Sequence, residues 1–298
     1  MSEPVYLVDA SIFVFRAWHA VPDTLVDARG NPVNALHGFA RFISDLLEQV
    51  KPKHLAVAFD ASLRNSFRNQ LYPPYKANRD PAPQELKRQF ALCRQVCEAL
   101  GVACFSSLEY EADDIIGTLA TRMRAQGKSI VLLSRDKDLT QLIRPGDVYW
   151  DYLGEKRYQY DDIPEKFGVL PERIPCYLAV MGDAVDNIPG VPGLGSKSAS
   201  TLFKHFESLM HLYDNLEQVN KLKLRNPSFV VSQLREHKDS ALLARQLTAI
   251  KCDMPLEVEL RALSRQAPDL SRLYEIYEAA NFGQLLRHQA ERIARAFN

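Results

Sequence analysis

The side chains best suited to chemistry in this 298-residue sequence are carboxylates that follow short apolar runs. Asp9 and Asp60 each end such a run, and Asp136 and Asp138 come shortly after a third. If these runs are parallel strands of one sheet, their carboxyl ends share an edge, which is where open α/β sheets bind ligands. The sequence therefore predicts that several acids gather at one edge of a sheet.

Two further groups of acids stand between and after these positions. Glu111, Asp113 and Asp114 lie at the start of a helix-like stretch, where carboxylates are favoured as caps and by the helix dipole. Capping requires only one acid, however, so three within four residues exceed that need. Asp183 and Asp186 are three residues apart, and on a helical turn they would share a face.

Acids gathered in this way point to divalent metal ions. Like charges ~4 Å apart cost several kcal/mol at an intermediate dielectric, so a bound cation is the economical explanation. Oxygen ligands suit Mg²⁺ or Mn²⁺ rather than zinc. Two such ions ~3.5–4 Å apart can activate water and stabilise the leaving oxygen in phosphodiester hydrolysis. Any one of these acids taken alone is more often a cap or a surface charge than a metal ligand; their shared position at strand ends is the specific signal.

The elements that must position the acids follow from hydrophobic patterning. Runs rich in β-branched residues alternate with helical periodicity, which predicts a doubly wound, mostly parallel α/β sheet. The expected strands are Val5–Val8, His54–Phe59, Val102–Phe105 and Ser129–Leu133. The expected helices are Leu36–Gln49, Glu85–Leu100 and Asp113–Gln126. Strand signals fade after about residue 160, so we expect an α/β domain over 1–160 and a mostly helical part over 161–298.

Residues 61–95 form a basic stretch that is too long for an ordinary βα loop of ~2–6 residues. Long loops of this kind are usually functional or disordered. Its basic residues are Arg64, Arg68, Lys76, Arg79, Lys87, Arg88 and Arg94, against the acids Asp80 and Glu85. Tyr72 and Tyr75 lie among them.

A glycine-rich segment follows Asp186 directly. Gly190, Gly193 and Gly195 allow a tight turn whose backbone amides can approach a phosphate, and a helix opening near Ser196 adds its positive end. Lys197 adds charge. The spacing is not that of a Walker A loop or a dinucleotide fingerprint. It favours a helix–hairpin–helix-like contact with a nucleic-acid backbone, and an ordinary Gly-Pro turn between helices is the alternative.

Bulk composition narrows the class of protein. The formal net charge is zero, so binding to a polyanion must come from local patches. Five cysteines without a C-x-x-C pair indicate buried thiols in a reducing compartment. The N-terminus lacks a basic n-region, and no apolar run approaches the ~18 residues of a membrane span. These features predict a soluble, cytoplasmic protein, which we expect to be monomeric.

The motifs together resemble the bacterial 5′-nuclease family, which includes the N-terminal nuclease domain of DNA polymerase I and free-standing flap endonucleases. The matching segments are LVDAS, AVAFDA, SFRNQLYPPYKANR, YEADD, SRDKDLTQL and GDAVDNIPGVPGLGSKSA, in family order over roughly residues 5–205. The resemblance implies a PIN-like nuclease core, in which the basic stretch 61–95 forms a helical arch for a single-stranded 5′ end, followed by a helical DNA-binding part. It also implies a two-metal 5′-3′ exonuclease and flap endonuclease that leaves a 5′-phosphate and a 3′-hydroxyl during DNA replication or repair. Without a polymerase domain, the chain would be a free-standing enzyme or a separately expressed fragment.

Roles for individual residues are implied only by this resemblance. Asp9, Asp60, Glu111 and Asp113 would hold one ion; Asp113, Asp136, Asp138 and Asp183 would hold the other; Asp114 and Asp186 would act from outside or through water. In the arch, Lys76 and Arg79 would face the scissile phosphate, with Arg16 near the cleaved strand. Phe15, Arg64, Arg68 and Tyr75 would contact DNA, such as a 5′ flap or a nicked or frayed duplex end. The glycine hairpin would hold duplex DNA, often with K⁺.

Two positions depart from the family pattern. Phe15 stands where many relatives have a tyrosine, and Arg135 replaces a small residue before the D-K-D motif. The alternatives to an active nuclease are a non-catalytic DNA-junction binding protein on the same fold and a PIN-like ribonuclease. An aspartyl-phosphate phosphatase is excluded because Asp9-Ala10-Ser11 lacks the required D-x-D.

Overall fold

A computed structural model describes residues 3–61 and 66–297 and divides into two compact units. Unit 1 comprises Met1–Ala61, Pro81–Ser134 and Cys252–Asn298, and unit 2 comprises Ser62–Asp80 and Arg135–Lys251. Each unit is assembled from segments that pack together although they are not consecutive in the sequence. The boundary near residue 160, which rests on a change in sequence character, stays a prediction.

Unit 1 is built on parallel strands in the order β3-β2-β1-β4. The strands are β1 (Val5–Asp9), β2 (His54–Asp60), β3 (Ala103–Ser107) and β4 (Ile130–Leu133). Val5 is in register with His54 on one side and with Ile130 on the other. Because β1, β2 and β4 are almost continuously buried, these apolar runs form the interior of a sheet covered on both faces. The expected mostly parallel α/β fold is confirmed.

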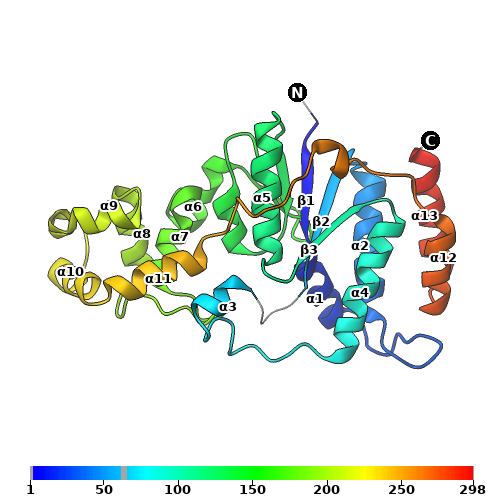
Figure 1. The fold of residues 1–298 in the computed structure, drawn as a ribbon, viewed down its shortest axis with the longest axis horizontal. Coiled ribbons are helices and arrows are strands. Elements are labelled where there is room, and N and C mark those ends of the chain that lie inside the picture. Colours follow the sequence, from blue (N-terminus) through cyan, green and yellow to red (C-terminus); the bar gives the residue numbers. More distant parts are fainter. Residues whose placement is uncertain (1–2, 62–65, 298) are drawn as a thin grey trace. The chain divides into compact units, whose positions relative to one another are not determined.

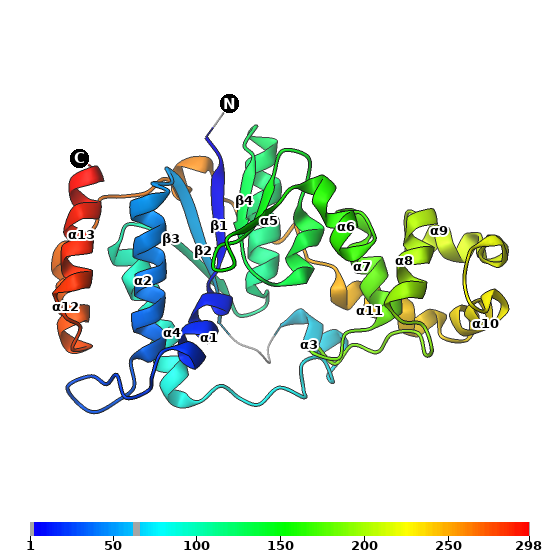
Figure 2. The same cartoon turned by 180° about the vertical axis from the view of Figure 1, so that it is seen from behind.

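Helices cover both faces of this sheet (Figures 1 and 2). The helices of unit 1 are α1 (Ala10–Ala20), α2 (Asn34–Gln49), α4 (Gln84–Ala99), α5 (Ala112–Ala125), α12 (Leu270–Ala279) and α13 (Gln284–Phe297), with a 3-10 turn at Leu260–Leu263. One face is covered by α5 and the other by α1, α2 and α4, while α12 and α13 pack outside α4 and α2. The helix α1, which follows β1 without a loop, was not anticipated.

Unit 2 is mostly helical, as expected after residue 160. Its helices are α3 (Phe67–Leu71), α6 (Ile163–Phe167), α7 (Ile174–Met181), α8 (Ser196–His205), α9 (Leu209–Asp214), α10 (Pro227–Glu236) and α11 (Lys238–Thr248). Shorter 3-10 turns lie at Lys137–Leu142, Tyr160–Asp162, Pro171–Arg173 and Leu216–Lys221. Unit 2 also contains an antiparallel hairpin of β5 (Val148–Asp151) and β6 (Lys156–Tyr158), which the sequence did not predict.

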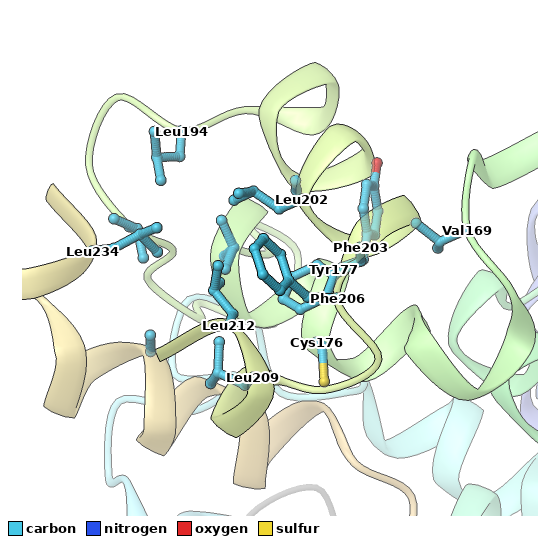
Figure 3. Packing of buried hydrophobic residues seen from close by; sticks show 14 of the residues in the cluster. Val169, Cys176, Tyr177, Leu194, Leu202, Phe203, Phe206, Leu209, Leu212 and Leu234 are labelled. Carbon is cyan, nitrogen blue, oxygen red and sulfur yellow. The ribbon is translucent and has the colours of Figure 1, made fainter. Parts of the chain in front are cut away.

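The helices of unit 2 enclose a core of their own (Figure 3). On α8, Ala199, Leu202 and Phe203 are fully buried, and Phe206 follows one turn later, so one helical stripe faces inward. Tyr177 of α7 packs in the same cluster. Because this stripe is buried, the start of α8 and its opposite face are left exposed.

The structure shows how far each cysteine is buried and how long the apolar helices are. Cys93, Cys97 and Cys176 are buried thiols, and Cys104 and Cys252 are partly buried thiols. Across the part of the chain that the structure describes, no helix is both long and apolar enough to cross a membrane.

Gly101 joins α4 to β3 and receives a close backbone contact in unit 1. Its φ is +73°, and a Cβ atom there would lie 2.1 Å from the carbonyl oxygen of Gln266. Gly127 has nearly the same φ, +74°, but open space around it. We expect Gly101→Ala to lower the free energy of unfolding by ~1–3 kcal/mol more than Gly127→Ala, because only the first must displace backbone. Chemical denaturation measures both, and equal losses would show that backbone conformation alone matters.

Candidate active site

Asp9 and Asp60 are linked at the carboxyl ends of β1 and β2. Asp9 ends β1 and caps α1, and its Oδ1 accepts the Ser11 N–H at 3.1 Å. The Ser11 hydroxyl donates to Asp60 Oδ2 at 2.7 Å, and the Ser134 hydroxyl donates to Asp9 Oδ2 at 3.0 Å. Asp60 Oδ1 accepts the N–H of Ala112 at 2.8 Å, so the start of α5 is tied to the end of β2. Neighbouring strands thus present carboxylates at one edge, as predicted.

The first turn of α5 carries the next acids. Glu111 precedes the helix and forms a capping box with Asp114, whose Oδ2 accepts the Glu111 N–H at 3.0 Å. Asp114 is fully buried, which fits a capping role, whereas Asp113 is partly exposed. Through Asp60, these acids belong to the same edge of unit 1 as Asp9.

Asp136 and Asp138 lie in unit 2 at the start of a 3-10 turn. Asp136 Oδ1 accepts the Asp138 N–H at 2.8 Å, and Tyr149 donates its hydroxyl to the Asp136 carbonyl. Asp138 Oδ1 is buried and has no hydrogen-bond partner among the described residues. Burial raises the pKa of Asp136, and burial with the charge of Asp136 raises the pKa of Asp138 well above its usual range.

Asp183 and Asp186 stand on a tight turn rather than on the expected helical turn. Antiparallel hydrogen bonds between Asp183 and Ile188 close this turn, and Asn187 within it has a left-handed backbone, φ 56°. Asp183 Oδ1 accepts the Val185 N–H, and its Oδ2 lies 2.7 Å from the ammonium of Lys137. The expectation of a shared helical face is therefore wrong.

The predicted cations of the arch are paired with Asp186. Lys76 Nζ lies 3.8 Å from Asp186 Oδ2, the Arg79 guanidinium binds Oδ1, and Tyr75 donates its hydroxyl to Oδ2 at 3.3 Å. The Lys76 N–H also donates to the Asp186 carbonyl, and Lys76 has a left-handed backbone, φ 54°. Strain of this kind is concentrated at functional sites. Between Leu71 and α4, the arch segment that carries these cations has no helix.

Lys137 was assigned no role from the sequence, although it stands between Asp136 and Asp138. Burial lowers its pKa, but the hydrogen bond to Asp183 and the neighbouring carboxylates outweigh burial, so its pKa is raised. The D-K-D spacing signals that a cation accompanies the acids, but it does not reveal Asp183 as the partner. Arg135, which departs from the family pattern, forms an ion pair in which its Nε lies 3.4 Å from Oδ2 of Asp151 in β5.

The donor chemistry of the acids fits divalent cations. All the candidate metal ligands are carboxylate oxygens, and among the described residues no hydrogen-bond donor is directed at the buried Asp138 Oδ1. Among the described residues, however, no group of three or more His, Cys, Asp or Glu side chains is arranged to hold an ion. In unit 2, cationic side chains already neutralise Asp183 and Asp186.

Two residues that were expected to contact DNA, Arg68 and Tyr75, are buried in the structure. Arg68 is 2% exposed, and its guanidinium donates to the carbonyls of Leu247 and Ala249. Tyr75 is 3% exposed and bound to Asp186. Both side chains are committed to the interior of unit 2, so neither forms an exposed DNA surface here.

Two other expected DNA contacts are accessible. Phe15 and Arg16 are exposed on α1, and the Phe15 ring packs edge-on against Phe90. Arg64 lies outside the described residues.

The glycine hairpin requires glycine for two reasons: a left-handed backbone at one position and a close backbone contact at another. Gly193 has φ +76°, and a Cβ at Gly190 would lie 2.5 Å from the backbone nitrogen of Gly182. Gly195 precedes α8 with open space around its Cα. The exposed residues Gly193, Gly195, Ser196 and Lys197 leave this helix start accessible to a ligand.

Asp138→Asn tests the buried carboxylate. A raised folded-state pKa means that the favourable contribution of Asp138 is present below its unfolded pKa and is lost as pH rises through the folded value. In chelator-treated protein, we expect the melting temperature of Asp138→Asn to exceed that of the parent by ~2–4 °C at neutral pH. The difference should shrink toward pH 4. The exposed control Asp161→Asn should change little, and a pH-independent difference would contradict the assignment.

Comparisons with known proteins cover almost the whole chain. The model of the 5′-3′ exonuclease N-terminal resolvase-like domain matches residues 4–168, and that of the 5′-3′ exonuclease C-terminal SAM fold matches 169–271. DNA polymerase I of Rhizobium leguminosarum is 36% identical over 96% of this chain, which spans 28% of that protein. A 5′-3′ exonuclease of Buchnera aphidicola (subsp. Acyrthosiphon pisum) is 34% identical, covering 87% of this chain and 91% of that one.

Solved structures share the fold. The T5 5′-exonuclease with bound zinc has a TM-score of 0.68 at 19% identity, covering 98% of this chain and 99% of that one. The catalytic core of Rad2 in complex with DNA substrate has a TM-score of 0.62 at 16% identity, covering 100% and 93%. From the two matching domain models and the full-length relatives, the chain belongs to the 5′-3′ exonuclease family.

Proposed function

We propose that this chain is a structure-specific 5′ nuclease that hydrolyses DNA phosphodiesters at 5′ flaps and at nicked or frayed ends. The observation that carries the proposal is the linkage of Asp9 and Asp60 to each other and to the start of α5, in a chain of the 5′-3′ exonuclease family. The chain spans about a third of the polymerase relatives, so their whole-protein activities do not transfer to it.

Each acid has a defined part in this proposal. Asp9, Asp60, Glu111 and Asp113 would hold one divalent ion, and Asp136, Asp138 and Asp183 would help hold a second, with Asp113 shared. Mg²⁺ or Mn²⁺ would polarise the phosphodiester and lower the pKa of the attacking water. The T5 5′-exonuclease, which shares the fold, has divalent zinc bound, and the T5 D15 protein has been co-crystallised with metal ions, which supports this part.

The cations would act on the phosphate itself. Lys76 and Arg79 are both paired with Asp186, so their charged groups are positioned before substrate arrives. Directed at the scissile phosphate, they would stabilise the charge that develops during hydrolysis. Asp114, which is buried and caps α5, would support the site without binding an ion directly. Arg16 and Phe15, both exposed, would contact the cleaved strand.

Duplex DNA would bind at the glycine hairpin. The exposed amides at the start of α8 and the Lys197 ammonium suit a phosphate backbone, and such contacts carry no sequence information. A K⁺ ion at the hairpin carbonyls and a monomeric, cytoplasmic enzyme that serves replication or repair complete the proposal. The products would be a 5′-phosphate and a 3′-hydroxyl.

Asp136→Ala tests the metal-ligand role on a 5′-flap substrate with and without Mg²⁺. We expect cleavage to fall by at least ~10²-fold, because a ligand that acts in the transition state is lost. Flap binding, measured by fluorescence anisotropy, should stay within a few-fold of the parent, and Asp161→Ala should keep both. Equal losses of binding and cleavage would assign Asp136 to DNA binding; uncleaved flap with the parent protein in Mg²⁺ would favour a non-catalytic junction binder.

Lys197→Ala tests the duplex contact. Removing one phosphate contact should weaken duplex binding and reduce the slope of log affinity against log salt by ~0.9. Cleavage of a single-stranded 5′ end should change less than cleavage of a flap. An unchanged salt slope would remove Lys197 from the interface.

A further inference from the structure

Two segments of unit 2 that lie far apart in the sequence pack against each other. Residues 74–79, here called the cation segment, carry the two cations of the arch, and residues 183–188, here called the acid turn, carry two of the acids. Tyr75 and Ile188, which are 3% and 4% exposed, belong to one apolar cluster with Leu247. Apolar packing holds the segments together, but it is non-directional and does not set how their backbones are aligned.

Two asparagine side chains set this alignment. Asn187 of the acid turn donates an Nδ2–H to the Pro74 carbonyl at 2.7 Å. In return, Asn78 of the cation segment donates an Nδ2–H to the Ala184 carbonyl at 2.9 Å. Because both partners are carbonyl oxygens, only the NH₂ end of each amide can be directed at them. Each segment thus supplies one donor to the backbone of the other, toward opposite ends of the contact.

Lys76 lies midway between the two residues of the cation segment that make these bonds. Its N–H donates to the Asp186 carbonyl at 2.9 Å, and its backbone is left-handed, φ 54°. Such a backbone is unfavourable for a residue with a Cβ atom and persists where surrounding contacts hold it. Pro74 and Asn78 are each two positions from Lys76, so their hydrogen bonds hold the chain on both sides of the strained residue. Asn187 is left-handed as well, φ 56°, a conformation that asparagine adopts more readily than lysine.

The charged ends of the cation segment depend on this backbone. Lys76 Nζ lies 3.8 Å from Asp186 Oδ2, and the Arg79 guanidinium binds Oδ1 of the same carboxylate. An ammonium on a flexible four-carbon stem is a weak restraint by itself, and the Arg79 side chain is 37% exposed. The alignment of the two backbones therefore decides where both charges lie relative to Asp183.

We propose that Asn78 and Asn187 are positioning residues for phosphodiester hydrolysis. Their amide bonds lock the cation segment to the acid turn, so Lys76 and Arg79 are presented to the scissile phosphate at a fixed distance from the acids. This role rests on the proposed nuclease function. Neither asparagine contacts DNA or a metal ion in it; both act through the residues that they align. The alternative is a pair of loop contacts that stabilise the fold and nothing more.

Hydrogen exchange followed by nuclear magnetic resonance tests the lock without reference to activity. In Asn78→Ala and in Asn187→Gly, the Lys76 N–H should exchange ~3–10-fold faster than in the parent, the factor expected for the loss of one hydrogen bond. Glycine at position 187 deletes the amide but keeps the left-handed backbone accessible. The matched control is Asn281→Gly, because Asn281 is exposed in unit 1 and has nearly the same backbone, φ 55°. It should leave the exchange of Lys76 unchanged, and unchanged exchange in both lock variants would overturn the lock.

Single-turnover cleavage of a saturating 5′ flap in Mg²⁺ tests the positioning. Each lock variant should slow cleavage ~10-fold or more and change flap affinity by less than ~threefold. In a Lys76→Ala/Arg79→Ala background, the same substitutions should slow cleavage by less than ~twofold, because no cation remains to be positioned. Asn281→Gly should cleave as the parent does. The two lock variants break opposite ends of the contact, so a folding defect in one leaves the other as the test.

The contrary results are distinct. Equal losses of rate with and without the two cations would show that the asparagines act independently of Lys76 and Arg79, and would overturn the proposal. A loss of flap affinity that matches the loss of rate would make them DNA contacts, and a lower melting temperature with unchanged cleavage would leave them a structural role alone. An uncleaved flap with the parent protein would reject the nuclease function and with it the positioning role, while faster exchange in the variants would still confirm the lock itself.

Discussion

The structure depends on the interactions that offset repulsion between carboxylates that are partly buried and lie close to one another. In unit 1 the solution is neutral: serine hydroxyls and backbone N–H groups donate to Asp9 and Asp60. In unit 2 it is ionic, because Lys137 neutralises Asp183 and the arch cations neutralise Asp186. The exception is Asp138, whose buried Oδ1 accepts no hydrogen bond from any residue that the structure describes. An ion held by Asp183, as proposed, would take the place of the Lys137 ammonium.

The Asp183 turn and the glycine hairpin, which lie within residues 182–197, form one structural element. Gly182, which precedes the Asp183 turn, approaches Gly190 so closely that neither position accommodates a side chain. The turn that presents Asp183 and Asp186 is therefore braced against the first glycine of the hairpin. A nuclease must align duplex DNA with the scissile phosphate. The connection would serve this purpose, because a movement of the hairpin would be passed to Asp183 and Asp186 directly through backbone contacts.

The sequence predicted the parallel strands and the acids that end them, because apolar β-branched runs and strand-end carboxylates are local signals. It failed where tertiary packing decides. Arg68 and Tyr75 carry the charge and ring expected of a DNA contact, but no local pattern shows that both are buried. The turn at Asp183 looked helical from spacing alone, whereas the left-handed Asn187 and the bridge to Ile188 make it a closed turn. The Lys137–Asp183 pair joins residues 46 positions apart and has no signature in either segment.

The central claim is that divalent cations bind among acidic side chains that come from distant segments of the chain. Counting bound Mn²⁺ on chelator-treated protein by electron paramagnetic resonance tests this most directly, since free and bound ions give distinct signals. We expect about two ions per chain, as in two-metal phosphodiester hydrolysis. Asp9→Ala and Asp136→Ala should each lose binding at one of them. Saturation with no bound Mn²⁺, or undiminished binding in both variants, would contradict the account.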